Sequence, residues 1–326
     1  MNALNLKDFR ANLDALTVGF YYDSKTQTML QVINVLNEPS ESIECNLTRS
    51  KDYKVESFKG NKSELLELLD GKEGEIRHEL FNSIKSVLEL KIPVYLYGSA
   101  GAGKNHTVEQ IANEMKLDFY FTGKVTDEFK ICGYGDVNGK FVETQFYQAF
   151  TKGGLFFFDE MDASNENALI MLNAGLANGY FDFRFVGRVK MHENFRCVAA
   201  GNTTGRGATE VYNGRNQLDG ACLDRFFALK FEYDHRIELK MANQNTELVD
   251  FIHDLRNASK RANLPLVCSY RCINMITKLS TFMQLDLALE GAIFKGMEKH
   301  DLEMLYNGLK IDSCYKKAMK DLINKL

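Results

Sequence analysis

The sequence contains no apolar run long enough to span a bilayer, and its first eight residues hold no apolar stretch behind a basic patch. These absences predict a soluble, cytoplasmic protein with no membrane association. The seven cysteines are odd in number and lack paired spacing, which fits free thiols in a reducing compartment better than a disulfide framework. Cys268 and Cys272 have no second cysteine or histidine pair at zinc-finger spacing, so we expect both thiols on one helical face in a core.

The chain also lacks an excess of positive charge, internal repeats and low-complexity segments. Its formal net charge of -4 gives no overall attraction to nucleic acid, although a local basic pore could still exist. With 326 residues, 45% of them hydrophobic, the chain is long and apolar enough for one principal domain with smaller appendages.

Short apolar runs alternate with helical patterns between Pro93 and Phe231. Five of these runs are typical of strands buried on both faces: Val94–Tyr97, Asp118–Phe121, Leu155–Phe158, Cys197–Ala200 and Phe227–Phe231. This alternation predicts an α/β fold in which a parallel sheet is flanked by helices.

The flanking segments have different patterns. Apolar residues around a polar stretch between Val18 and Val35 predict a hairpin, and Ile43–Phe58 supplies further strand. Helical spacing predicts one helix before the sheet and a helical lid after it, with helices over Glu73–Leu90, His235–Ala242, Glu247–Ala262 and Tyr270–Met283. We therefore expect a small α+β appendage at residues 1–72, a core at 73–231 and an α-helical lid at 232–326.

The segment that follows the first predicted strand has the G-x-x-x-x-G-K core of a phosphate-binding loop. Glycines in such a loop let backbone N–H groups face phosphates, the next helix offers its N-terminus, and the lysine reaches the terminal phosphates. A buried strand directly before the loop and a helical pattern directly after it supply the context that the motif requires. We therefore expect ATP to contact Gly98, Ser99, Ala100, Gly101, Ala102, Gly103, Lys104, Asn105 and His106.

One position departs from this motif, because Asn105 stands where serine or threonine normally offers a hydroxyl to Mg²⁺. Thr107 is no substitute, since residues two apart on a helix point to different sides. The Asn105 carbonyl oxygen can ligate the metal or accept from a metal-bound water. We expect nucleotide binding with a weakened dependence on Mg²⁺.

Carboxylates and an amide follow two further apolar strands. Asp159 and Glu160 end one of them, where Asp159 would hold Mg²⁺ through water and Glu160 would orient and deprotonate the attacking water. Asn202 ends the other, and its amide could hydrogen-bond both that water and a phosphate oxygen. Taken alone, Asn202 is typical of a turn, so its assignment depends on its place in the series.

Two arginines complete the predicted site. Arg225 lies just before the last strand, where it could reach the nucleotide of a neighbouring subunit and stabilise transition-state charge. Arg271 begins a lid helix, from which it could contact the phosphates of its own subunit. For either arginine taken singly, a surface salt bridge is the simpler interpretation.

In their order, these residues resemble the AAA+ ATPases, and within them the MoxR, CobS and dynein-related branch, over about Phe81 to Leu279. The resemblance implies a P-loop NTPase core with a helical lid. The family's elements are Walker A, Walker B, sensor 1, arginine finger and sensor 2, matched here by Lys104, Asp159 with Glu160, Asn202, Arg225 and Arg271. Only Asn105 departs from the pattern.

The branch is also marked by two hairpins. Residues 133–141 contain an Asn-Gly turn signal, and residues 180–191 alternate aromatic with polar side chains before Gly187. Tyr134 and Phe141 could grip a substrate in a pore, or could pack within their own hairpin.

The resemblance implies a hexameric ATPase ring that remodels a protein substrate. It also implies a partner with a von Willebrand factor A domain, since related ATPases often work with such partners. An alternative is a DNA-associated ATPase of replication or repair, as in phages, which the acidic balance weakly opposes. A second alternative is a nucleotide-gated scaffold that does not hydrolyse ATP, against which Glu160, Asn202 and Arg225 argue.

Overall fold

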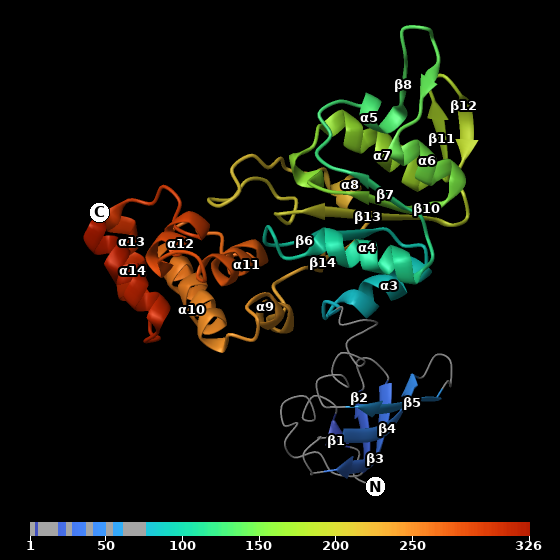
Figure 1. Cartoon of the computed structure of the whole chain (residues 1–326). Helices are drawn as coiled ribbons and strands as arrows, with labels where there is room; N and C mark the ends of the chain where they lie inside the picture. Colours follow the sequence, from blue (N-terminus) through green and yellow to red (C-terminus); the bar gives the residue numbers. More distant parts are fainter. Residues whose placement is uncertain (1–3, 6–18, 24–27, 37–41, 50–54, 61–75) are drawn as a thin grey trace. The chain divides into compact units, whose positions relative to one another are not determined.

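The computed structural model describes residues 4–5, 19–23, 28–36, 42–49, 55–60 and 76–326 (Figure 1). The chain divides into two compact units, Met1–Arg77 and His78–Leu326.

The N-terminal unit contains a five-stranded sheet whose strands lie in chain order. They are β1 (Leu4–Asn5), β2 (Gly19–Asp23), β3 (Thr28–Leu36), β4 (Ser42–Arg49) and β5 (Val55–Gly60). β1 pairs with β2 in parallel, and the other neighbours are antiparallel. The hairpin expected between residues 18 and 35 is confirmed by β2 and β3.

The second unit is built on five parallel strands in the order β14-β6-β13-β10-β7. They are β6 (Val94–Tyr97), β7 (Phe119–Thr122), β10 (Gly154–Phe158), β13 (Phe195–Gly201) and β14 (Phe227–Lys230). All five apolar runs form strands whose ends lie within two residues of the predicted ends. The predicted parallel sheet is therefore confirmed.

Helices cover both faces of this sheet, because successive side chains of a strand point to opposite faces. In β10, Leu155 and Phe157 share an apolar core with α3 (Phe81–Glu89) and α4 (Lys104–Glu114). Phe156 and Phe158 belong to a second core on the other face, with α6 (Gln145–Lys152) and α7 (Glu166–Asn178). Both cores are nearly free of solvent, and each buried phenylalanine contributes roughly 1.5–3 kcal/mol to stability. Figure 1 shows the two helix pairs on opposite sides of the strands.

The helix expected over Glu73–Leu90 is shorter than predicted. It begins only at Phe81, and residues 73–75 lie outside the described residues. Just before it, the His78 ring stacks on Phe231 with 3.8 Å between ring centroids, and His78 Nδ1 accepts the Leu80 N–H at 3.1 Å. The tertiary contact with Phe231 holds His78 outside the helix, and the apolar spacing of the sequence does not reveal it.

The remaining elements of the α/β part are short. They are α5 (Phe129–Cys132), β8 (Tyr134–Gly135), β9 (Phe141–Val142), the 3-10 helix η3 (Met161–Ala163), β11 (Tyr180–Phe183), β12 (Gly187–Lys190) and α8 (Gly220–Leu223). β8 pairs with β9 and β11 with β12, both antiparallel, so the two predicted hairpins are confirmed.

Six helices follow the sheet and share a separate apolar core. They are α9 (His235–Met241), α10 (Thr246–Ala262), α11 (Tyr270–Leu279), α12 (Leu285–Ala292), α13 (Lys299–Gly308) and α14 (Cys314–Lys325). Cys268 and Cys272 are buried in this core as expected, but Cys268 precedes α11 and does not lie on the helix. None of the helices that the structure describes combines the length and apolarity needed to cross a bilayer.

Candidate functional site

Predicted site residues meet at one edge of the parallel sheet, where three neighbouring strands end. β6 leads into the loop 98–103, β13 into Asn202, and β10 into Asp159 and Glu160. Because β13 lies between β6 and β10, Asn202 comes between the loop and the two carboxylates. The carboxyl ends of parallel strands are the usual place for ligand sites in open α/β sheets.

The loop 98–103 leaves the N-terminus of α4 open to a ligand. Gly103 caps this helix with a φ of 89°, a left-handed conformation that favours glycine. No side chain caps α4, and its first turn contains no acidic residue. The first N–H groups of a helix have no intrahelical partner, so this uncapped end favours an anion such as phosphate.

Lys104 is the first residue of α4 and is only 6% exposed. Its ammonium group donates to the carbonyl oxygens of Gly98 at 2.9 Å and Ser99 at 3.0 Å, and to Asn202 Oδ1 at 3.4 Å. Burial lowers the pKa of Lys104 to about 8, although the charge of Asp159 acts in the opposite direction. An anion bound at the loop would favour the charged ammonium and raise this pKa again.

Asn105 and Asp159, the two predicted metal-binding residues, lie in direct contact. The Asn105 Nδ2 donates to Asp159 Oδ2 at 3.1 Å, while the other Asp159 oxygen accepts the backbone N–H of Glu160 at 2.9 Å. Rotation of the Asn105 amide would exchange its nitrogen and oxygen. The pair can then present carboxylate and amide oxygens, which are the ligand types that Mg²⁺ accepts, so these residues fit a Mg²⁺ ion.

Glu160 has a backbone conformation that is uncommon for a residue with a side chain. Its φ of 54° and ψ of 38° lie in the left-handed region, which costs about 1–2 kcal/mol for an L-residue other than glycine. Its half-exposed carboxylate accepts from Arg215 Nη2 at 3.2 Å. Strained conformations of this kind persist where surrounding contacts fix them, often at functional sites.

Asp162 and Arg215 form a buried hub that the sequence analysis missed. Asp162 is fully buried, and its Oδ2 accepts from the backbone N–H groups of Asn202 at 3.0 Å and Thr203 at 2.9 Å, and from the Thr203 hydroxyl at 2.9 Å. Its Oδ1 accepts from Arg215 Nη1 at 3.0 Å. A β-carbon added to Gly201 would lie 2.9 Å from Asp162 Cγ, so glycine is required for this approach. The hub therefore joins the end of β10 to the end of β13.

The lid meets the loop through the start of α11. The Tyr270 N–H donates to the Gly101 carbonyl at 3.3 Å. A β-carbon added to Gly101 would lie 2.7 Å from Ser269 Cβ and 4.0 Å from Arg271 Cγ. The start of α11 therefore brings the exposed Arg271 next to the loop.

Two tyrosines outside the predicted set also contact the loop. The Ala100 N–H donates to the Tyr212 hydroxyl at 2.9 Å, and the Tyr233 hydroxyl donates to the Ala100 carbonyl at 2.9 Å. Tyr212 comes from the segment after β13, and Tyr233 from the connection between β14 and α9. No motif identifies either residue, because only the folded chain brings these two hydroxyls to the loop.

Three predicted site residues lie apart from the central group. Ala102 is buried in the core on the α4 face, and His106 is exposed in the first turn of α4. Arg225 donates to the Ala221 carbonyl in the preceding turn. Among the residues that the structure describes, no hydrogen bond or ion pair joins Arg225 to Lys104 or Glu160.

Comparisons with known proteins found a similar sequence and similar solved structures. The chain is 22% identical over 262 residues to an uncharacterized protein of Staphylococcus epidermidis (strain ATCC 12228 / FDA PCI 1200), covering 72% of this chain and 95% of that protein. Solved structures with similar regions include NtrX from Brucella abortus, at 14% identity and a TM-score of 0.43. That match covers 67% of this chain and 49% of NtrX, so the chain spans about half the length of that protein.

A structure of a putative ATPase from Cytophaga hutchinsonii ATCC 33406 matches at 15% identity and a TM-score of 0.41, covering 72% of this chain and 90% of that one.

The segment that contains the loop, both carboxylates and Arg225 is similar to a described family. Residues 93–226 match the family model of the AAA domain (dynein-related subfamily).

Proposed function

We propose that the chain binds and hydrolyses ATP at the loop 98–105. The observation that carries this proposal is a continuous set of contacts from the candidate phosphate-binding lysine to the candidate base. Lys104 contacts the Asn202 side chain, the Asn202 backbone contacts Asp162, and Arg215 connects Asp162 with Glu160. These residues place a cation, an amide and a carboxylate together at the end of one sheet, and these are the kinds of group that phosphoryl transfer to water uses.

In this proposal, the uncapped end of α4 and Lys104 bind the β- and γ-phosphates. Lys104 exchanges the carbonyl oxygens of Gly98 and Ser99 for phosphate oxygens, and Arg271 adds a second positive charge from the lid. Asp159 and Asn105 hold Mg²⁺, which supplies charge neutralisation on the phosphates when it is bound.

Glu160 is the proposed general base. Its carboxylate takes a proton from water as the water oxygen bonds to the γ-phosphorus and the bond to the β-phosphate oxygen breaks. Asn202 orients this water and a γ-phosphate oxygen through its amide. Because Arg215 Nη2 lies 3.2 Å from Glu160, Arg215 holds the carboxylate at the edge of the site and must share it with the water.

Position 105 gives a prediction about magnesium. The Asn105 amide points its donor group at Asp159, whereas the hydroxyl of Asn105→Thr can ligate Mg²⁺. The Mg²⁺ concentration for half-maximal ATP hydrolysis should therefore fall about fivefold in this variant. This change is equivalent to about 1 kcal/mol of binding free energy. Asn105→Ala is the matched control, which removes the oxygen and should raise that concentration. Mg²⁺ titrations of the ATPase rate measure both. Identical Mg²⁺ titration curves for the wild type, Asn105→Thr and Asn105→Ala would show that the side chain at position 105 does not bind the metal.

We further propose that the active form is a ring, in which Arg225 acts on the nucleotide of the neighbouring subunit. Arg225 is half-buried and donates to the Ala221 carbonyl of its own chain, and among the described interactions it has no hydrogen bond or ion pair with Lys104 or Glu160. An arginine in this position can serve a second chain, and a ring supplies one at every site.

A mixing experiment tests this in-trans role. We expect Arg225→Ala and Glu160→Gln each to lower hydrolysis at least a hundredfold, since an arginine finger is worth about a thousandfold or more. When the two variants are mixed in equal amounts, about a quarter of the interfaces should regain activity. At these interfaces an Arg225→Ala subunit supplies the intact Glu160, and its Glu160→Gln neighbour supplies the intact arginine. Full activity of Arg225→Ala alone, or no recovery on mixing, would contradict the in-trans role.

The two hairpins support a protein substrate for this ring. Tyr134, Val137, Phe185 and Val186 on them are exposed apolar residues, whereas Phe141 packs against Tyr147 with 4.9 Å between ring centroids. Exposed apolar side chains favour contact with a polypeptide over contact with a nucleic-acid backbone. DNA that stimulates the ATPase rate, where unfolded protein does not, would instead favour the replication or repair alternative.

The proposed branch is that of MoxR and CobS, with a von Willebrand factor A domain protein as partner. In the same proposal residues 1–72 form an adaptor for the partner or substrate, residues 73–231 form the ATPase core, and residues 232–326 form the lid. Pull-down with the chain truncated to residues 73–326 tests the adaptor role, since it should lose the partner and keep ATP binding.

A further inference from the structure

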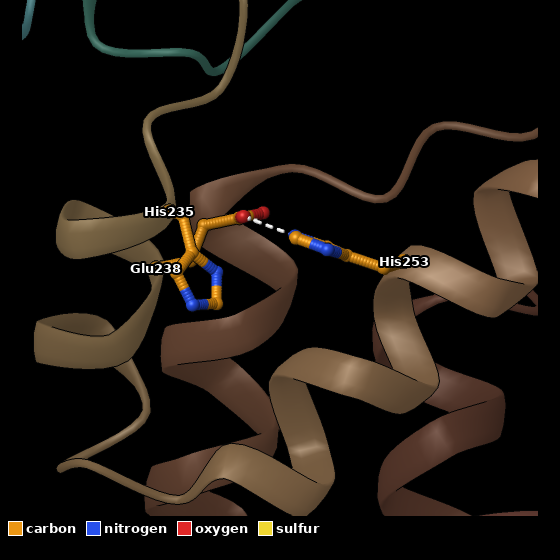
Figure 2. Close-up of side chains that lie close together, drawn as sticks. All are labelled: His235, Glu238 and His253. Atoms are coloured by element: carbon orange, nitrogen blue, oxygen red, sulfur yellow. Dashed lines mark hydrogen bonds and ion pairs between the residues drawn. The ribbon is translucent and has the colours of Figure 1, made fainter. Parts of the chain in front are cut away.

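A group of potential metal ligands lies in the lid, away from the proposed Mg²⁺ residues. His235 and Glu238 are three residues apart on α9, and His253 comes from α10 (Figure 2). One ligand atom of each residue lies within 4.8 Å of the other two. Residues three apart share one face of a helix, so α9 presents both of its side chains to α10.

The three side chains differ in exposure in a way that suits a metal ion. Glu238 is only 1% exposed, His253 is half-buried, and His235 is exposed. Glu238 Oε2 lies 2.5 Å from His253 Nε2, as the dashed line in Figure 2 shows. The carboxylate therefore anchors the group inside the lid, and the His235 side gives access from solvent.

Arg256 pairs with one oxygen of the Glu238 carboxylate and leaves the other oxygen for a metal ion. Its Nη1 lies 2.6 Å from Glu238 Oε1, the oxygen that does not face His253. The guanidinium is also fixed by the Cys268 carbonyl, which accepts from Nε at 2.9 Å, and by the Tyr233 ring, 3.9 Å away. Arg256 thus orients the Glu238 carboxylate from behind, as polar groups around metal ligands commonly do.

We propose that His235, Glu238 and His253 bind one divalent transition-metal ion, with zinc as the best match. Two imidazoles and one carboxylate are a known zinc ligand set that leaves a fourth position for water. Zinc–ligand distances of about 2.0–2.2 Å place the ligand atoms roughly 3–4 Å from one another. The ligand atoms of the three residues lie within 4.8 Å of one another, so small side-chain rotations reach this spacing. The ion takes the place of the hydrogen bond between His253 and Glu238.

Such an ion would tie α9 to α10. α9 begins two residues after Tyr233, whose hydroxyl donates to the Ala100 carbonyl. The bound ion would therefore rigidify the part of the lid that adjoins the phosphate-binding loop. The proposal concerns binding and lid stability, and it holds whether or not the chain hydrolyses ATP.

Zinc binding to the full chain tests the proposal, by calorimetry in buffer without nucleotide after chelator treatment. We expect one site that weakens at least tenfold in His235→Ala and in His253→Ala. His300→Ala is the matched control, since it removes an exposed histidine of α13 outside the group, and it should bind as the wild type does. Cys314→Ser, which removes an exposed thiol, should also keep the site.

Thermal unfolding gives a second readout. Zinc should raise the Tm of the wild type and of His300→Ala, and should leave that of His235→Ala unchanged, because binding to the folded state alone stabilises it. His235 is exposed, so its replacement by alanine should preserve the circular dichroism spectrum. Absence of zinc binding by the wild type, or equal affinity of wild type and His235→Ala, would overturn the proposal.

Discussion

Replacement of Glu160 by glutamine should abolish ATP hydrolysis while ATP binding is retained. The amide keeps the shape of the carboxylate but cannot take a proton from water, and loss of a general base costs roughly 10²–10⁴-fold in rate. Phosphate release measures the first effect, and equilibrium binding of ATP measures the second. Glu160 contributes no polar contact to the loop 98–103 among the described interactions, so its replacement should leave the ATP affinity within about threefold.

Glu166→Gln is the matched control for this change. Glu166 is an exposed acid in the first turn of α7, six residues further along the chain, and its replacement should leave the hydrolysis rate unchanged. Retention of more than a tenth of the wild-type rate by Glu160→Gln would exclude Glu160 as the base. An equal loss in Glu166→Gln would mean that the defect arises from the fold around β10.

The largest loss of stability is expected from Asp162→Ala. This substitution leaves the N–H groups of Asn202 and Thr203 without their acceptor, and it leaves the largely buried Arg215 guanidinium with only the half-exposed Glu160 as its ion-pair partner. Removal of one partner from a buried ion pair costs about 3–5 kcal/mol, so the free energy of unfolding should fall by that amount. Urea denaturation followed by circular dichroism measures the change.

Asp182→Ala is the matched control for Asp162→Ala. Asp182 pairs with Arg188 on the β11–β12 hairpin, but both side chains are more than half exposed, at 59% and 65%. A surface ion pair contributes about 0–1 kcal/mol, so this variant should be close to the wild type. Similar free energies of unfolding for both variants would contradict the assignment of Asp162 as a structural hub.

The sequence was most informative where one physical requirement controls a whole segment. Strands buried on both faces need continuous apolar runs, so β6 was predicted with its observed ends and β10 within one residue. The order Lys104, Asp159, Asn202 along the chain was enough to place all three at one sheet edge, because parallel strands end on the same side.

Tertiary contacts account for what was not predicted. The apolar spacing before Phe81 continues the pattern of α3, but His78 stacks on Phe231, and the helix begins only at Phe81. Arg215 lies in a segment of irregular structure with no periodicity, so only the folded chain reveals its contact with Glu160. The sequence marks Asp162 only as the third carboxylate within four residues. Its structural role depends on the backbone N–H groups after β13, which the sequence pattern does not show.

The most direct test of the central claim is phosphate release from Mg²⁺-ATP by the purified wild-type chain, with Glu160→Gln measured in parallel as the background. We predict release that saturates with ATP in the wild type and falls to background in the variant. A wild-type rate equal to that of Glu160→Gln at saturating ATP would contradict the assignment of this site as an ATPase.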